Sequence, residues 1–386
     1  MKFEADNTEH ILVRGVNWLG DAVMSTPALL RLREARPAAH ITLLTPAKLV
    51  DLWPHHPALD AVISIRPGEG AWSVAQKLRR ERFDLALVLP NSPRSALETW
   101  LAGISSRIGY AAKWRRWLLT QIVPPRNGAI EMRKRSVREI KRRIESPKSS
   151  DATPNGTNLP PAVHHIQQYL HLTAALGANP APLAPHLEVT DDEIAETDAM
   201  FRGDMRRKLE KVLPPDRIVW LGLNPSAEYG PAKRWPVEKY VAAAREISKR
   251  VKNCVWLIFG GASDAPLAEE IARSLGACAV NLAGKTSLRE LMALLKRCEV
   301  LLTNDTGPMH VAAALGTPVV ALFGSTSASL TGPGLPQDPR NTILSAGAPC
   351  SPCFLRKCPI DFRCMAGVQV EQVVRAVQAG LRSGRS

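Results

Sequence analysis

The chain has 386 residues, of which 45% are hydrophobic and 22% are charged. This length and composition predict two domains of ~100 to 200 residues each, and they exclude a mini-protein or a wholly disordered chain. The 50 Lys and Arg outnumber the 36 Asp and Glu, and the net charge of +14 favours an acidic partner.

The first half of the chain repeats a short apolar strand, a loop and an amphipathic helix. We predict strands at residues 11–16, 40–44, 61–65 and 84–89, and helices at about 22–35, 47–52, 71–81 and 95–101. Because the strands are apolar without period-two alternation, both faces of their sheet should be covered. The pattern is typical of a parallel sheet between layers of helices.

The segment at 102–148 is strongly basic, with thirteen Lys or Arg and three Glu. The cations within 133–143 are predicted either to bind an anionic membrane or acceptor, or to form a solvated face. Residues 146–161 are rich in Ser, Pro, Asn and Gly, which predicts a flexible loop.

The second half repeats the pattern after an extended connector. Strands are predicted at 218–223, 255–259, 279–282, 300–303 and 319–323, with helices starting near 237, 266, 287 and 306 and a final helix at about 370–382. A boundary at residue 187 gives two Rossmann-like α/β domains, 1–187 and 188–386. Ligands bind beyond the carboxyl ends of the strands in such sheets, so the loops there are the candidate sites.

Asp21 follows the first strand in the sequence Asn-Trp-Leu-Gly-Asp. It is predicted either to cap the following helix or to act as a carboxylate in the site. The loop lacks the GxGxxG pattern, which argues against NAD or FAD.

Three loops of the second half suit a nucleotide. Lys233 and Arg234 would bind a diphosphate, unless they are ordinary surface charges. Thr306 or Gly307 would cap a helix whose free N–H groups bind an anion, and His310 would be either a phosphate donor or a packed histidine. Asp264, after Gly260 and Gly261, would take ribose hydroxyls or cap a helix.

Four cysteines lie in the loop at 350–364, at Cys350, Cys353, Cys358 and Cys364. Their number suits a structural zinc ion, although their spacing is not that of a zinc ribbon. The alternative is a compact loop in which reduced thiols pack.

The motifs RGVNWLGDAVMSTPAL, PSAEYGPAKRWP, TNDTGPMHVAAALGTPVVALFG and CSPCFLRKCPIDFRCM resemble the lipopolysaccharide heptosyltransferases of glycosyltransferase family 9, especially their heptosyltransferase II branch. The chain departs from the family at residues 146–161, which look like an insertion, and at Ser226, where the family usually has Gly.

The resemblance implies a GT-B fold, with two parallel sheets facing across a cleft. It implies an inverting, metal-independent enzyme without a cofactor. The donor would be ADP-L-glycero-β-D-manno-heptose, bound by the second domain. The acceptor, bound by the first domain, would be the first heptose of the inner core on Kdo-lipid A. We expect a cytoplasmic protein, peripheral on the anionic inner face of the inner membrane, because the sequence has no transmembrane run and no secretory signal.

Carried over residue by residue, the resemblance makes Asp21 the general base and Lys233 a catalytic contact to the diphosphate. The donor would be bound by Ser226, Lys233, Arg234, Gly261, Asp264, Asp305, Thr306, Gly307 and His310. The acceptor would be bound by Trp18, Gly20, Asn91, Ser92 and Arg94.

Two rival functions remain. One is a GT-B enzyme that uses another nucleotide-sugar. The other is a basic nucleic-acid-binding protein, against which the basic segment lacks an RNP or zinc-finger pattern and has few aromatic residues, so we expect no nucleic-acid partner.

Overall fold

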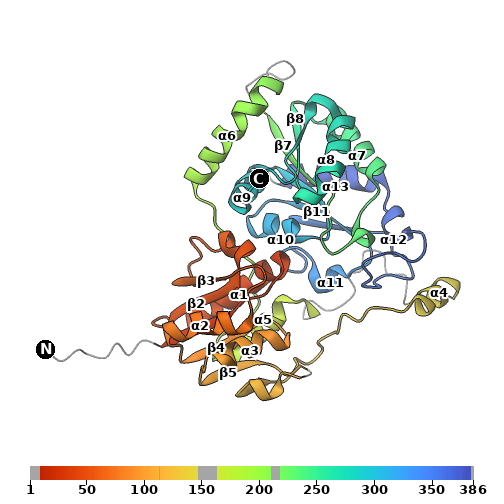
Figure 1. Ribbon diagram of the computed structural model, residues 1–386. Helices are drawn as coiled ribbons and strands as arrows, with labels where there is room; N and C mark the ends of the chain where they lie inside the picture. Colours follow the sequence, from red (N-terminus) through yellow and green to blue (C-terminus); the bar gives the residue numbers. More distant parts are fainter. Residues whose placement is uncertain (1–8, 113, 147–162, 210–217, 384–386) are drawn as a thin grey trace. The chain divides into compact units, whose positions relative to one another are not determined.

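The computed structural model describes residues 9–112, 114–146, 163–209 and 218–383 (Figure 1). The chain divides into two compact units. We name them the N-terminal unit, Met1–Ala129 with His165–Glu188, and the C-terminal unit, Ile130–His164 with Val189–Ser386.

The N-terminal unit is built around one six-stranded parallel sheet. Its strands are β1 (His10–Arg14), β2 (His40–Pro46), β3 (Ala61–Ile65), β4 (Leu85–Val88), β5 (Ser106–Tyr110) and β6 (Gln121–Val123). Its helices are α1 (Leu19–Ala35), α2 (Ala71–Glu81), α3 (Pro93–Leu101) and α5 (Ile166–Ala174), with 3-10 turns η1 (Ala47–Leu52) and η2 (Arg116–Leu118).

The strand order of this sheet is β3-β2-β1-β4-β5-β6, with every neighbouring pair parallel. From β1 the chain continues to β2 and β3 on one side of β1, and it then forms β4 on the other side of β1. The switch point of the topology therefore lies between β1 and β4. Helix α1 packs against α5, and α2 packs against α3. The predicted layered α/β arrangement is therefore confirmed.

The C-terminal unit repeats this design. Its strands are β7 (Val219–Asn224), β8 (Cys254–Ile258), β9 (Ala279–Asn281), β10 (Val300–Asn304), β11 (Val319–Phe323) and β12 (Asn341–Ser345). Its α-helices are α4 (Val137–Glu145), α6 (Asp191–Leu209), α7 (Val237–Arg250), α8 (Ala265–Leu275), α9 (Leu288–Arg297), α10 (Gly307–Ala314), α11 (Ala328–Thr331), α12 (Arg363–Ala366) and α13 (Val370–Ser383). Its 3-10 turns are η4 (Pro231–Lys233), η5 (Ala262–Asp264) and η6 (Gly276–Cys278).

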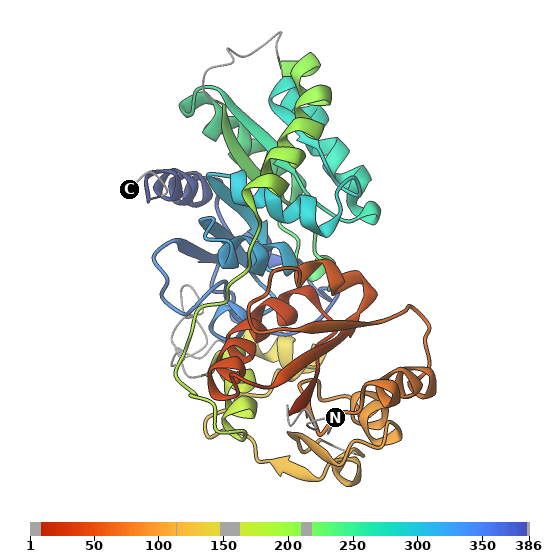
Figure 2. The ribbon, with the colours of Figure 1, turned by 90° about the vertical axis from the view of Figure 1, so that its left-hand side faces the viewer.

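The second sheet has the order β12-β11-β10-β7-β8-β9, which is the same topology as the first sheet, with its switch point between β7 and β10. Helix α7 packs against α8 and α13, whereas α6 packs against α9 (Figures 1 and 2). The central strands are buried on both faces, as their apolar sequences predict.

The structure differs from the sequence prediction in the polar and short elements. The segment at 47–52 is a 3-10 turn, and strands β5, β6 and β12 and helices α4, α5 and α6 were not predicted. Strands β6 and β12 are the edges of their sheets, where one side of the strand faces no partner and polar residues are tolerated, and β5 is the strand next to the edge. Their sequences therefore lack the apolar run that marks a central strand.

Residues Ile130–His164 group with the C-terminal unit, whereas the predicted boundary at residue 187 placed them in the first domain. Contacts between this segment and the cysteine-rich loop explain the grouping. Arg135 donates hydrogen bonds to the carbonyls of Cys350 (3.1 Å) and Cys353 (3.0 Å). Arg143 donates to the carbonyl of Pro349 at 3.0 Å, and Ile140 is buried in the core of this unit. Most of the loop predicted at 146–161 lies outside the described residues.

Among the described residues, none of the helices combines the length and apolar character that a membrane crossing requires.

Candidate active site

The predicted nucleotide loops all leave the carboxyl ends of strands in the C-terminal unit. Strands β7 and β10 pair in parallel, with Asn224 beside Thr303. The loop after β7 carries Lys233 and Arg234, and the residues after β10 are Asp305 and Thr306. Both loops therefore begin at the switch point, which is where open α/β sheets bind ligands.

Lys233 and Asp305 form an ion pair across the two loops. The ammonium nitrogen lies 2.6 Å from Asp305 Oδ2 and 3.4 Å from the Asp305 carbonyl oxygen. Thr326, which follows β11, donates its hydroxyl to the same Oδ2 at 2.5 Å. The Lys233 ammonium also lies 5.0 Å from the centre of the Tyr229 ring. These contacts hold a cation in a fixed place at the strand ends.

The buried side chain of Asn304, the last residue of β10, ties the two loops together. Its amide nitrogen donates to the carbonyls of Pro225 (2.8 Å) and Ser226 (3.3 Å). Its amide oxygen accepts from the backbone N–H of Trp235 (3.2 Å) and the hydroxyl of Tyr240 (2.8 Å). Four hydrogen bonds from one residue thus fix the loop after β7, including the buried Ser226. The sequence analysis missed this role of Asn304.

Asp264 serves as a local cap and as an ion-pair partner. Its Oδ2 accepts the backbone N–H of Gly261 at 3.1 Å, which closes the first turn of η5. Its Oδ1 accepts from Arg234 at 2.9 Å. At the N-cap of the following helix α8, the Asp264 side chain makes no capping hydrogen bond, so its cap contact belongs to η5 and its ion pair links η5 to the Lys-Arg loop.

Helix α10 begins at Gly307, with Thr306 at its N-cap and Pro308 in its first turn. The Thr306 side chain makes no capping hydrogen bond, so its hydroxyl does not close the helix end. The first N–H groups of such a helix favour an anion. His310 is buried one turn further along.

The cysteine-rich loop supports the loop after β7. The Tyr229 hydroxyl donates to the carbonyl of Phe354 at 2.7 Å, and the Ala232 N–H donates to the carbonyl of Arg356 at 3.0 Å. Gly230 has φ 151°, and a Cβ there would stand 2.5 Å from that Arg356 oxygen. Only glycine therefore allows this close approach.

The four cysteines of this loop are not joined in disulfides, and Cys350, Cys353 and Cys364 are buried. Burial raises the pKa of Cys364 to about 12. Within the described part of the chain, no group of three or more His, Cys, Asp or Glu is arranged to hold a metal ion. The carbonyls of Phe354 and Arg356 give the loop a structural role through its backbone.

In the N-terminal unit, Trp18 occupies the N-cap position of α1, and Asp21 is the third residue of the helix. The reading of Asp21 as the helix cap is therefore wrong, because the helix starts two residues earlier. Gly20 lies between them in the first turn. The exposed Trp18 ring lies 5.2 Å from the Lys48 ammonium.

Asp21 accepts a hydrogen bond from Tyr169 of α5, which packs along α1. Burial, together with the neighbouring Asp21 charge, raises the pKa of Tyr169 well above its usual value. Tyr169 therefore stays protonated and keeps donating to the carboxylate. The sequence analysis missed this contact, since α5 is separated from α1 by more than a hundred residues.

Asn91, Ser92 and Arg94 leave the end of β4, on the other side of the N-terminal switch point. Ser92 is the N-cap of α3 and accepts the Ser95 N–H at 3.3 Å. Arg94 is paired with the buried Glu98 at 2.9 Å, whose other oxygen accepts from Arg14 at 2.8 Å. The predicted acceptor residues of both loops thus lie at the carboxyl ends of adjacent strands β1 and β4.

The sequence model of "Glycosyltransferase family 9 (heptosyltransferase)" matches residues 71–136 and 153–362. The chain belongs to glycosyltransferase family 9. It is 32% identical over 334 residues to lipopolysaccharide heptosyltransferase 2 of Escherichia coli K12, a match that covers 84% of this chain and 85% of that protein. It is 31% identical over 335 residues to lipooligosaccharide heptosyltransferase 2 of Haemophilus ducreyi, covering 84% and 85%.

The solved structure of E. coli ADP-heptose lps heptosyltransferase II matches this family 9 chain with a TM-score of 0.73 and 28% identity. The match covers 98% of this chain and 100% of that chain. The predicted α/β fold of the GT-B class and the predicted glycosyltransferase activity are therefore confirmed.

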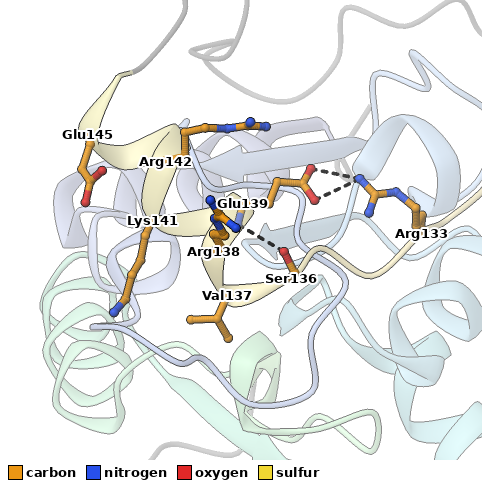
Figure 3. Close-up of a pocket in the computed structure, with 8 residues that line it drawn as sticks. All are labelled: Arg133, Ser136, Val137, Arg138, Glu139, Lys141, Arg142 and Glu145. Atoms are coloured by element: carbon orange, nitrogen blue, oxygen red, sulfur yellow. Dashed lines mark hydrogen bonds and ion pairs between the residues drawn. The ribbon is translucent and has the colours of Figure 1, made fainter.

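The family 9 chain also has a basic surface at α4. A concavity of about 990 Å³ is lined by residues of the segment 133–145. Figure 3 shows Arg138, Lys141 and Arg142 on the exposed sides of the helix, while Arg133 is paired with Glu139 at 3.0 Å. Arg133 of the predicted basic run is thus paired, and Lys134, Arg138, Lys141 and Arg142 are exposed to solvent.

Proposed function

We propose that this enzyme transfers L-glycero-D-manno-heptose from ADP-heptose to the first heptose of the lipopolysaccharide inner core on Kdo-lipid A. We propose that it inverts the anomeric centre and needs neither a metal ion nor a cofactor. The observation that carries the proposal is the Lys233–Asp305 pair at the C-terminal switch point. The heptosyltransferase 2 relatives support this choice of sugar and acceptor.

The positive groups of the C-terminal unit suit a nucleoside diphosphate. Lys233 is oriented by Asp305, and the N-terminus of α10 follows directly in the chain. In the proposed mechanism both supply positive charge to the leaving diphosphate as it gains negative charge, which is the task of Mg²⁺ in metal-dependent enzymes. These two groups support the proposal that no metal ion is needed.

Two buried polar groups near these loops also favour a polar ligand. Asn224, at the end of β7, and Ser325, after β11, have side-chain atoms without a hydrogen-bond partner among the described residues. Buried groups of this kind usually have a partner. The hydroxyl and phosphate groups of a nucleotide-sugar would supply one.

Asp21 would serve as the general base. The acceptor hydroxyl oxygen bonds to the anomeric carbon while the bond from that carbon to the ADP oxygen breaks. Asp21 takes the hydroxyl proton, and ADP leaves with the electron pair of the broken bond. Displacement from the opposite side inverts the anomeric centre, and a positioned base accelerates this step.

The test is a transfer assay with Kdo-lipid A core that lacks its second heptose. ADP-heptose should be used in strong preference to UDP-glucose or GDP-mannose, EDTA should leave the rate unchanged, and NMR of the product should show inversion. Preferred use of another nucleotide-sugar would establish the rival GT-B function. Activity lost in EDTA and restored only by Mg²⁺ or Mn²⁺ would reject the metal-independent mechanism.

We also propose that the enzyme works in the cytoplasm, on the inner face of the inner membrane, and binds no nucleic acid. The net charge of +14 supports an anionic surface as partner. Saturable binding of duplex DNA or RNA at physiological salt would contradict this part of the proposal.

A further inference from the structure

Three tryptophans of the N-terminal unit lie exposed near the end of α3. Trp114 is 84% exposed, Trp117 66% and Trp100 42%. The rings of Trp100 and Trp117 meet edge to face, with centroids 6.0 Å apart, and η2 packs on α3. We name these three residues the tryptophan patch. Large aromatic side chains left in water in one place indicate a surface that is covered by a partner.

The chain around the tryptophan patch is uniformly basic. Residues 99–130 contain five Lys or Arg and no Asp or Glu. Arg116 is exposed between Trp114 and Trp117 in the sequence. Two further cations are anchored at the patch, since Arg107 donates to the Leu118 carbonyl at 2.7 Å and Arg79 donates to the Leu101 carbonyl at 2.6 Å. The charge of this surface is therefore complementary to an anionic one.

The tryptophan patch is connected to the loop that carries the predicted acceptor residues. Arg115, which separates Trp114 from Arg116, is completely buried and donates to the carbonyl of Pro90. Pro90 directly precedes Asn91. A partner that holds the patch therefore lies close to the acceptor loop of the same unit.

We propose that the tryptophan patch inserts into the headgroup region of an anionic bilayer and is the membrane anchor of the enzyme. The proposal rests on the proposed function, because a lipid-linked acceptor explains why an anchor adjoins the acceptor loop. Tryptophan rings favour the interface between water and hydrocarbon, since the ring body is apolar and the ring N–H can still find a partner. The arginines add attraction to anionic headgroups.

The proposed anchor is the tryptophan patch and not the basic helix α4. Arg138, Lys141 and Arg142 are exposed there, but they belong to the C-terminal unit and no exposed aromatic ring accompanies them in α4. Cationic side chains are attracted to an anionic bilayer but do not insert into it, and salt screens this attraction. The tryptophan patch supplies the apolar contact that persists at high salt.

The experiment measures binding of the full chain to vesicles of phosphatidylethanolamine and phosphatidylglycerol, and of phosphatidylcholine alone. The Trp114→Ala/Trp117→Ala double variant should bind the anionic vesicles about tenfold more weakly than the wild type. Phosphatidylglycerol with brominated acyl chains should quench the fluorescence of the wild type, and this quenching should be lost in the double variant. Met200→Ala removes another exposed apolar side chain, in the C-terminal unit, and should bind like the wild type.

Unchanged vesicle binding and unchanged quenching in the double variant would overturn the proposal. A wild-type dimer that the double variant converts to monomer, with vesicle binding unaltered, would also overturn it, because the partner would be a second copy of the chain. Circular dichroism and thermal unfolding confirm that each variant is folded. As a second variant, Arg116→Glu should weaken binding at low salt and have little effect at high salt.

Transfer to a delipidated, water-soluble core oligosaccharide separates this inference from the proposed function. The double variant should keep the wild-type rate on that acceptor and lose rate only on the vesicle-bound one. If the wild type transfers no heptose to either acceptor, the proposed function fails, while the vesicle measurements still decide whether the tryptophan patch binds membranes.

Discussion

At the scale of single residues, the charge of Lys233 is placed by its contacts with Asp305 and Tyr229. We expect Lys233→Ala to lower kcat by about 10²-fold as well as weaken ADP binding, because negative charge grows on the leaving oxygen as the bond breaks. Steady-state kinetics and calorimetry of ADP binding measure the two effects. Lys249→Ala, which removes an exposed lysine of α7, should match the wild type. A raised KM with intact kcat would mean that Lys233 only binds the ground state.

Tyr169 is a positioning residue for Asp21. Tyr169→Phe keeps the packed ring but removes the hydroxyl that donates to the carboxylate. Loss of that hydrogen bond leaves the charged form of Asp21 less stabilised, so the acid limb of the pH–rate profile should move to higher pH and kcat should fall. The apparent affinity for ADP-heptose should stay the same. A profile identical to that of the wild type would show that the contact only holds α5 against α1.

His56 should make the N-terminal unit sensitive to acid. Burial, reinforced by the nearby His186, lowers the pKa of His56 from 6.5 to about 4. The folded state therefore binds fewer protons than the unfolded state. The contribution of neutral His56 to the free energy of unfolding is present in full above pH 6.5 and is lost as the pH falls toward 4. Between pH 7 and pH 5 the loss should be about 2 kcal/mol.

Denaturant unfolding at the two pH values measures this loss. His56→Gln does not titrate and should show a smaller loss than the wild type. His55→Asn keeps a residue that tolerates the φ of 66° at the neighbouring position, and it should retain the wild-type loss. Equal losses in all three proteins would contradict the role of His56.

At the scale of elements, one side chain fixes the geometry of two loops. Asn304→Ala removes four hydrogen bonds and leaves buried partners unsatisfied. We expect the free energy of unfolding to fall by about 2 to 4 kcal/mol. ADP affinity should fall as well, because the loop after β7 carries Lys233. Unaltered stability and ADP affinity would show that the loops hold their shape without Asn304.

The elements also show what the sequence could predict. The central strands β1, β4, β7 and β10 are apolar because both sheet faces are covered, so their sequences alone identified them. Edge strand β12 is only partly buried and was not predicted. Helix α4 carries mostly charged residues, and its attachment to the cysteine-rich loop through Arg135 and Arg143 depends on backbone carbonyls, which a sequence pattern does not reveal.

At the scale of the whole molecule, the chain contains the same sheet topology twice, and the candidate residues lie at equivalent places in both copies. Asp21 follows β1, and Lys233 lies in the loop after β7, the first strand of each sheet. Strand ends and loop residues were therefore predictable from the sequence. The partners Asn304, Thr326 and Tyr169 were not, because each comes from a distant segment that only the folded chain brings to the site.

A single variant decides whether Asp21 is the general base. Asp21→Asn keeps the size of the side chain and removes its basicity, and the charge it removes from the first turn of α1 stabilises the helix by only ~0.3 to 1 kcal/mol. We expect kcat/KM for heptose transfer to fall by ~10²- to 10⁴-fold, with ADP binding and the unfolding temperature close to those of the wild type. Asp51→Asn, an exposed carboxylate of the same unit, is the matched control and should keep full activity. An Asp21→Asn enzyme that folds normally and transfers heptose at close to the wild-type rate would contradict the claim.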